Sequence, residues 1–426
     1  MSTKNTYGWF VVGTTLANQS IAMGVLLSGY ALFVLPWAEE FQVPQSQVLL
    51  GSTIVLVVNS LASPFAGKLM DKLSLRTLIL IGVACLAAGL LLISFASAFW
   101  MILAAYATLL PAAIIFCGSL SSQTLVSKWF TEGRGVALGV SSLGSSVGGF
   151  VLPLVISALI AAFDWRMTMI ILAVGAVAVL FPLNGLVLRK DPPKPADPSE
   201  TDTQAGAQVE PDWIASQLVR MPTFWIPVLG IVPLMAAYTG VQFNLGALVN
   251  SLSFGEGAEG VKNGLAAKLI STIAVGQVIG KLAASSASER IDHRVVYWIM
   301  AVLMAAALFL LSGEPSVTVL YIACLLLGSA VGATLPMLPI FYTSRLGAKS
   351  IGVILGIATL VLILGSFGSY VTGLIYEATQ SYDTAFLAMG ALLIPVSIAM
   401  FFLPSPEKAR KSWPQATLQS AATEGA

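Results

Sequence analysis

Twelve apolar stretches, each long enough to cross a bilayer, constrain this 426-residue chain more than any other feature. A helix needs about 20 consecutive apolar residues to span a hydrocarbon core of ~30 Å. Lipid offers the backbone no hydrogen bonds, so a span must satisfy its own polar groups, as an α-helix does. The predicted fold class is therefore an all-α polytopic membrane protein with 12 transmembrane helices. The stretches begin near Tyr7, Gln47, Thr77, Phe99, Gly135, Arg166, Thr223, Gly264, Val295, Val317, Ile351 and Thr384.

One polar break divides the spans into two groups of six. The sequence DPPKPADPSETDTQAGAQVEPD within it is too rich in Pro, Asp, Glu and Ser to bury an apolar core, so a flexible linker is expected. We predict an N-terminal half (1–188), a cytoplasmic linker (189–221), a C-terminal half (222–404) and a cytoplasmic tail (405–426).

The basic residues predict the orientation. With both termini on one side, 18 of the 21 Lys and Arg residues fall on that side when Lys281 is assigned to its half of the membrane, and the exceptions are Arg166, Lys262 and Lys268. Cytoplasmic segments carry such an excess of positive charge. We expect a multi-pass protein of the plasma membrane, of the bacterial inner-membrane type, with both termini in the cytoplasm.

The two halves repeat each other. A shift of 218 residues lays the loop Asp71–Arg76 on Glu289–Arg294. A shift of 217 places Gly135, Gly139 and Gly148 on Gly352, Gly356 and Gly365. A nearly constant offset indicates two parallel six-helix repeats, which is the arrangement of major facilitator transporters.

Two loops strengthen that resemblance. The segment GKLMDKLSLR, from Gly67 to Arg76, resembles the superfamily's G-x-L-x-D-R-x-G-R-R signature, with departures at Lys72 and Ser74. The stretch from Ser127 to Gly139 is similar to the junction between the fourth and fifth helices of that superfamily. The chain resembles a major facilitator superfamily member over essentially its whole length.

Within the superfamily, the chain resembles the monocarboxylate transporter and oxalate–formate exchanger branch. The opening YGWFVV, from Tyr7 to Val12, is similar to the G-W-x-W-V-V start of that branch. The resemblance places Lys281 at the branch's cationic position on helix eight and Gln277 at its polar partner position. The branch mostly has Arg where Lys281 stands, and the helix-one lysine of animal monocarboxylate transporters is replaced near Leu27.

Lys281 is a charge deep in an apolar span. It precedes Glu289 by eight residues, or about 12 Å of helix, which is close to half of the ~30 Å core. An ionisable group at that depth is costly and marks a substrate or ion path. Alternatively, the lysine stem could snorkel so that the amine reaches the cytoplasmic interface. We favour the substrate path.

The acidic residues point the same way. All 20 Asp and Glu residues map to loops, tails or helix ends. An exporter of cationic compounds would normally need a buried carboxylate, whereas a buried cation without an acidic partner predicts an anionic substrate. Protons could travel with a carboxylate, through deprotonation of Lys281, or not at all.

Other polar residues near span centres are candidates for the same site. The alternative for each is a hydrogen bond that only holds helices together. Helices one and seven line the central path in the superfamily, and Tyr238 and Gln242 share one face of helix seven. The predicted substrate-binding residues are Lys281, Gln277, Tyr238, Gln242, Asn18, Gln19 and Tyr370.

Resemblance also implies gating residues at the cytoplasmic ends of helices, namely Asp71, Gly67, Arg76, Arg134 and Glu289. The Asp71 carboxylate could meet the positive N-terminus of helix eleven or pair with Arg134. Glycines on helices five and eleven make small-residue faces, which we expect to pack across the interface between the halves. They include Gly144, Gly148, Gly149, Gly365 and Gly368.

The predicted function is a secondary transporter that moves a small organic anion, a monocarboxylate above all, by alternating access with or without a coupled proton. Two alternatives stay open: an exporter or facilitator of a neutral or amphiphilic solute, and a membrane sensor that transports nothing. The sequence shows no catalytic motif, and its three cysteines lack metal-ligand spacing. We expect no enzyme activity, cofactor, metal or nucleic-acid partner, and a monomer in the lipid bilayer.

Overall fold

The computed structural model describes residues 3–130, 134–188, 213–253, 262, 264–288, 290–347, 350–411 and 413, without the side chains of 3–6, 71, 134, 135, 215 and 335. Twelve helices in this part of the chain are long and apolar enough to cross a membrane, and each begins within two residues of its predicted start. The predicted fold class is confirmed: the described residues form helices and no strand.

The N-terminal half is built from α1 and the helices that follow it up to α9. Their bounds are α1 Thr3–Met23, η1 Gly24–Ser28, η2 Tyr30–Leu32, α2 Val34–Phe41, α3 Gln45–Lys72, α4 Leu75–Ser94, α5 Phe99–Ala107, α6 Leu109–Cys117, α7 Ser119–Trp129, α8 Arg134–Ala162 and α9 Trp165–Val187.

The C-terminal half runs from α11 to α20, preceded by the short α10. Their bounds are α10 Ala215–Leu218, α11 Pro222–Ser251, α13 Leu265–Ser288, α14 His293–Leu311, α15 Val317–Gly332, α16 Thr334–Leu346, α17 Ile351–Ser366, α18 Gly368–Thr379, α19 Asp383–Ala399, η3 Met400–Phe402 and α20 Pro406–Lys411.

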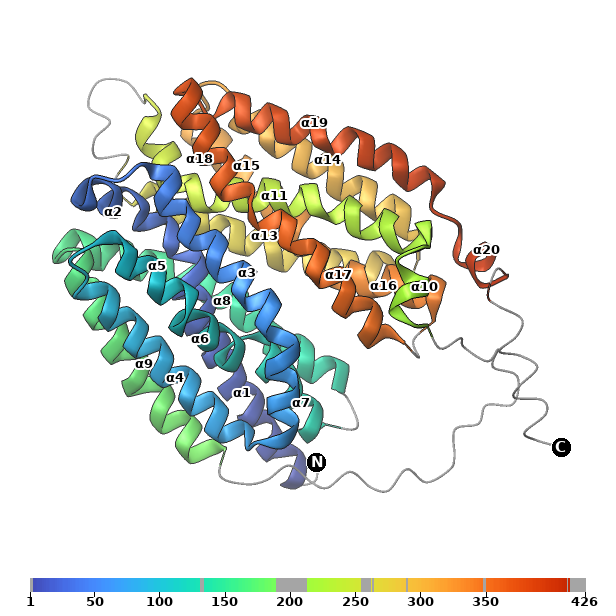
Figure 1. Ribbon diagram of the computed structural model, residues 1–426, viewed down its shortest axis with the longest axis horizontal. Coiled ribbons are helices and arrows are strands. Elements are labelled where there is room, and N and C mark those ends of the chain that lie inside the picture. The colour runs from blue at the N-terminus through green and yellow to red at the C-terminus, as the bar shows by residue number, and fades with distance from the viewer. Residues whose placement is uncertain are drawn as a thin grey trace.

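Figure 1 shows the two halves as separate bundles. They meet where α8 packs on α13 and where α3 packs on α17 and α18. The end of the molecule at which α1 begins and α20 lies is called the termini side here, and the opposite end the far side. In Figure 1 the bundles touch toward the far side and diverge toward the termini side.

Several spans are interrupted, which hydropathy alone did not indicate. The fourth span consists of α5, α6 and α7, and the equivalent tenth span breaks at Ala333 between α15 and α16. The first span contains a π-helical turn, Gly24–Ser28, in which the Gly29 N–H donates to the Gly24 carbonyl at 2.8 Å. Irregular backbone at membrane depth is tolerated where protein or a water-filled path covers it, and π turns are frequent at functional sites.

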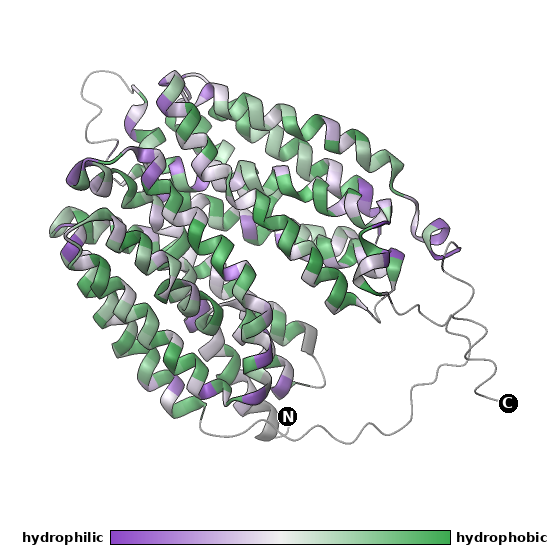
Figure 2. Cartoon of the chain, viewed as in Figure 1, coloured by the Kyte–Doolittle hydropathy of each residue, from purple (hydrophilic) through white to green (hydrophobic). Residues whose placement is uncertain are grey.

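The outer faces of the bundles are apolar. Figure 2 shows hydrophobic residues along the helices and hydrophilic residues gathered toward their ends. Large apolar side chains such as Phe65 and Phe402 are 74% and 77% exposed in the protein alone. Exposed apolar surface on this scale marks a membrane contact.

The glycine faces hold helices together within each half, contrary to our expectation for most of them. A Cβ on Gly148 would lie 2.0 Å from the Ser20 carbonyl oxygen of the first span, and one on Gly368 would lie 2.0 Å from that of Ala236 on α11. Gly144 likewise faces α1, and Gly365 likewise faces α11. Only Gly149 of these five approaches the other half, at Ala274. The expected packing across the halves is therefore wrong for the other four.

The end of the predicted linker lies against the C-terminal half. Trp213 is buried, its N–H donates to the Ser350 hydroxyl at 2.8 Å, and its indole Nε1–H donates to the Leu346 carbonyl at 2.7 Å. Residues 189–212, which form most of that linker, and most of the predicted tail lie outside the described residues. The domain boundaries therefore remain predictions.

Replacing Gly148 with alanine should destabilise the protein by about 1–3 kcal/mol, because the added methyl group would overlap the first span. Gly139→Ala is the matched control on the same helix, since a Cβ at Gly139 would meet no atom within 4 Å. We expect thermal unfolding in detergent to show a lower melting temperature for Gly148→Ala only. Equal melting temperatures for the two variants would contradict the close packing of α8 on the first span.

Candidate functional site

Lys281 reaches across the interface between the halves. Its Nζ donates to the hydroxyls of Ser145 and Ser146 on α8, at 3.3 and 3.1 Å. The lysine belongs to α13, and its side chain is half-buried. The amine therefore points at the opposite half, and α13 continues for almost two further turns to Ser288. The choice between the substrate path and the snorkelling alternative stays a prediction.

No described acidic side chain forms an ion pair with this amine. The ion pairs among the described side chains are Arg166–Glu40, at 2.5 Å, and Arg294–Asp292, at 2.7 Å. Both lie near helix ends. Two serine hydroxyls thus provide the only polar contacts of the Lys281 amine with described residues. Hydroxyl dipoles compensate a buried ammonium less well than a carboxylate would, because a charged acceptor makes the stronger hydrogen bond.

Gln277 and Tyr238 extend the site toward the far side. Gln277 lies one turn before Lys281 on α13, and its Nε2–H donates to the Tyr238 hydroxyl on α11 at 3.0 Å. Gln242 follows Tyr238 by one turn and is only 3% exposed. Its Oε1 atom has no hydrogen-bond partner among the described residues. Four of the predicted binding residues thus lie on neighbouring turns of two helices.

The break in the tenth span lies beside these residues. A Cβ on Gly332 would come within 2.3 Å of the Gln277 carbonyl oxygen, so α15 and α13 are in backbone contact there. Thr334, two residues further along, is buried and its hydroxyl has no partner. Sequence reasoning missed Thr334, Ser145 and Ser146. The Gly-Ala-Thr-Leu-Pro run from Gly332 to Pro336 could have signalled the break, because Gly and Pro interrupt helices.

The N-terminal candidates are engaged within their own half. Asn18 and Asn184 exchange two hydrogen bonds of 2.8 Å between α1 and α9. Gln19 donates to the Ser141 carbonyl and hydroxyl on α8, and its Oε1 accepts from the Ser119 hydroxyl. These contacts match the packing alternative stated for them. The structure does not bring Asn18 or Gln19 into contact with Lys281.

Tyr370 stands apart from the other candidates. It lies on α18, is half-buried and makes no hydrogen bond with a described residue. Its role in binding therefore rests on the sequence prediction alone.

Only part of the expected gate falls on described residues, and the gating roles stay predictions. A Cβ on Gly67 would meet no atom of a described residue within 4 Å, and the same is true of Gly352 and Gly356 at the start of α17. The side chains of Asp71 and Arg134, and Glu289 as a whole, lie outside the described residues. Among the described residues, every hydrogen bond between the halves lies at the level of Lys281 or toward the far side.

The arginines of the repeated loop make equivalent contacts in the two halves. Arg76 donates from Nη2 to the Gly185 carbonyl at 3.0 Å, and Arg294 donates from Nη1 to the Leu403 carbonyl at 3.2 Å. Both donors and both acceptors are related by the 218-residue repeat. Hydrogen bonds from Arg294 also hold the pKa of the Asp292 carboxyl below its ordinary value. Arg76 thus links α4 to α9 within the N-terminal half in this conformation.

A second set of contacts closes the far side. The Glu377 carboxylate, at the end of α18, accepts from the Ser46 N–H at 2.8 Å and from its hydroxyl at 2.9 Å. Gln45 donates from Nε2 to the Tyr382 hydroxyl at 2.7 Å. We call Gln45, Ser46, Glu377 and Tyr382 the far-side latch. A carboxylate at the first turn of α3 is also favoured by the helix dipole.

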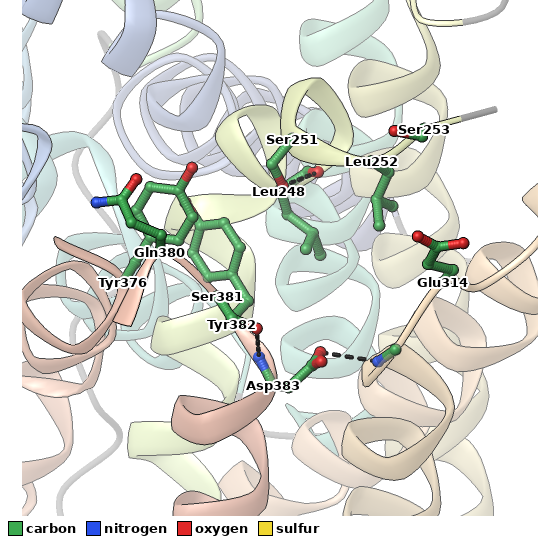
Figure 3. A pocket seen from close by; sticks show the side chains of 11 residues that line it. Leu248, Ser251, Leu252, Ser253, Glu314, Tyr376, Gln380, Ser381, Tyr382 and Asp383 are labelled. Atoms are coloured by element: carbon green, nitrogen blue, oxygen red, sulfur yellow. Dashed lines mark hydrogen bonds between the residues drawn. The ribbon is translucent and has the colours of Figure 1, made fainter. Parts of the chain in front are cut away.

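A pocket of about 240 Å³ opens beside this latch on the C-terminal half. Figure 3 shows Tyr376 and Tyr382 on one side of it and the carboxylates of Glu314 and Asp383 on another. Asp383 accepts a hydrogen bond of 2.7 Å from the Gly313 N–H. Two carboxylates repel an anion, and none of the predicted binding residues lines this pocket. It is therefore distinct from the site around Lys281.

Comparison with known proteins agrees with this architecture. The sequence profile of the Major Facilitator Superfamily matches residues 16–273 and 260–424. The chain belongs to the major facilitator superfamily. It is a transporter of that superfamily, not an enzyme, and it resembles the monocarboxylate transporter branch.

Two relatives with similar sequences are named monocarboxylate transporters. Monocarboxylate transporter 12 of Rattus norvegicus is 24% identical over 95% of this chain and 87% of its own length. Monocarboxylate transporter 13 of the same species is 23% identical over 93% and 89%. The MFS transporter asaE of Aspergillus flavus is 27% identical over 71% of this chain, and the match spans 64% of that relative.

Among solved structures, a bacterial homologue of the human lysosomal transporter Spinster has a similar fold. That crystal structure shows an inward-facing and unoccupied conformation. Its TM-score is 0.69 at 14% identity, over 95% of this chain and 98% of the other. At that identity the likeness concerns the fold alone.

Glu377→Gln should weaken the far-side latch, because it removes the charge that strengthens the two hydrogen bonds to Ser46. Ser52 is fully buried between the halves, with its hydroxyl 3.0 Å from that of Ser369. A cysteine placed there by Ser52→Cys would report opening through its labelling by a thiol reagent applied to the far side. We expect a rate about fivefold higher with Glu377→Gln, since a lost hydrogen bond costs about 1 kcal/mol.

Glu314→Gln is the control for this change, because that acid is exposed on the same side and outside the latch. Equal labelling rates in the Glu377 and Glu314 variants would show that the Glu377 contact does not hold the far side closed.

Proposed function

We propose that this protein is a secondary transporter of a small organic anion, namely a monocarboxylate, and that it works by alternating access. One observation carries the proposal: the Lys281 amine lies at the interface of the two halves without an acidic partner among the described residues. The names of the two monocarboxylate transporter relatives agree with this substrate class.

A carboxylate would complete the interactions that Lys281 lacks. The ammonium is a compact charge on a flexible stem, and a carboxylate oxygen accepts a stronger hydrogen bond from it than a serine hydroxyl does. Ser145 and Ser146, already within reach of the amine, could then donate to the same carboxylate. The anion would be held by residues of both halves.

Such bridging would link binding to a conformational change. A ligand shifts a two-state equilibrium only by the difference between its affinities for the two states. In the present state the far-side latch is formed, whereas Gly67, Gly352 and Gly356 contact no side chain or backbone of the other half among the described residues. In the opposite state the latch would separate, and the predicted gating residues Asp71, Arg134 and Glu289 would meet their partners.

We also propose how the protein is oriented in the membrane and how a coupled proton would travel. The excess of basic residues supports a cytoplasmic location for the termini side, and we propose that the described state opens toward the cytoplasm of a cell bounded by this plasma membrane. No Asp or Glu lies near a span centre in the sequence. A coupled proton would therefore travel on Lys281 or on the carboxylate itself. We propose that the monomer is the transporting unit.

Lys281→Gln should lower the uptake of labelled carboxylates into proteoliposomes by at least about tenfold, because losing one partner of a buried charge contact costs on the order of 2 kcal/mol or more. Lys281→Arg keeps the charge and should retain part of the activity. Lys268→Gln is the matched control, since it makes the same change at an exposed position of the same helix.

Uptake of an acid that is equally fast in wild type and Lys281→Gln would contradict the anion site. Transport of a neutral solute in place of any acid would support the alternative of a neutral-solute facilitator.

A further inference from the structure

Gln242 has a buried acceptor that the protein leaves unused. The residue is 3% exposed, and within the described part of the chain its Oε1 makes no hydrogen bond. Buried polar atoms almost always have a partner, and leaving one unsatisfied destabilises the folded state. Other buried atoms without partners belong to Trp37, Arg76, Thr334 and Arg345. Of these residues, Trp37 and the two arginines lie toward the helix ends, away from the site around Lys281.

The position of Gln242 relative to Lys281 follows from the helices that carry them. α11 runs from the termini side to the far side, and α13 runs in the opposite direction. The bond between Tyr238 and Gln277 sets a common level on the two helices. Gln242 lies one turn beyond that level toward the far side, and Lys281 lies one turn beyond it toward the termini side.

The two residues are therefore separated by two helical turns, or about 11 Å along the helix axes. Residues four apart share a helix face, so each lies on the face that carries its partner in the Tyr238–Gln277 contact. The long side chains of Lys281 and Gln242 can shorten the distance between their polar atoms. One elongated molecule could thus contact Lys281 at one end and Gln242 at the other.

We propose that Gln242 selects the substrate by accepting a hydrogen bond from a hydroxyl group at the end opposite to the carboxylate. This inference rests on the proposed function, which places the carboxylate at Lys281. The substrate class is an elongated carboxylic acid with a hydroxyl at the end opposite to the acid group, for which 4-hydroxyphenylacetate serves as a rigid probe. The Gln242 oxygen is an acceptor, so the ligand must donate; the Tyr238 hydroxyl already accepts from Gln277.

Selectivity follows from the physics of an unsatisfied group. A site whose buried polar groups are satisfied by a substrate hydroxyl discriminates against the analogue that lacks it, because the analogue leaves those groups unpaired. Gln242→Leu has a similar shape and removes the acceptor. Replacing an unpaired buried polar group by an apolar one of the same shape is neutral or stabilising. A purely structural hydrogen bond at Gln242 would make the same substitution destabilising.

The test compares the uptake of three labelled acids by full-length protein in proteoliposomes: 4-hydroxyphenylacetate, 4-methoxyphenylacetate and phenylacetate. The methoxy group accepts but cannot donate. We expect wild type to prefer the hydroxy acid over both others by about tenfold in kcat/KM, and Gln242→Leu to reduce that preference to near one. Gln47→Leu, the same change at an exposed position of α3, should keep the wild-type preference.

A second measurement is the melting temperature of the ligand-free protein, which Gln242→Leu should leave unchanged or raise. A lower melting temperature together with an unchanged hydroxyl preference would overturn the inference. If Gln242→Leu does not fold, the uptake of the three acids by wild type still tests the role of Gln242. Equal uptake of the hydroxy and methoxy acids would overturn that role.

These outcomes are distinct from failure of the proposed function. If wild type transports all three acids through Lys281 without a hydroxyl preference, only the role of Gln242 is wrong. If no acid is transported, or if Lys281→Gln transports them equally well, the anion site itself is wrong.

Discussion

The contact of the Lys281 amine with two serine hydroxyls across the interface is the interaction on which this account depends. A charge at that depth is costly in a membrane protein, and here the described residues offer it only the dipoles of Ser145 and Ser146. A carboxylate would supply the missing charge. The amine and the hydroxyls belong to different halves, so the same anion would also bear on how the halves are arranged.

The rest of the molecule is organised around that interface. The contacts on its far side, above all that of Glu377 with Ser46, are formed, whereas glycines of α3 and α17 on the termini side contact no described residue of the other half. Within each half, glycines bring helices into backbone contact, and Arg76 and Arg294 make equivalent hydrogen bonds to the ends of α9 and η3. Each half is thus braced internally, which suits movement of one half against the other.

The spans were predictable because they depend on apolar length, and the shared face of Tyr238 and Gln242 because residues four apart lie on one side of a helix. Lys281 and Gln277 were predicted from the depth of a charge in an apolar span and from the resemblance to the monocarboxylate transporter branch. The sequence could not tell whether a buried amide faces a path or a neighbouring helix, since that depends on helix rotation. Asn18 and Gln19 turned toward their own half for this reason. The predicted packing of the glycine faces across the halves was wrong for the same reason, because it also depends on helix rotation. Ser145, Ser146 and Thr334 were missed because small hydroxyl residues are common in apolar spans.

The most direct test of the central claim is the melting temperature of the purified protein in the presence of carboxylates. A ligand that binds only the folded state raises it. We expect a bound acid to stabilise wild type, its uncharged amide not to do so, and neither to stabilise Lys281→Gln. An equal stabilisation of wild type and Lys281→Gln by the acid would contradict the claim that this lysine receives the anion.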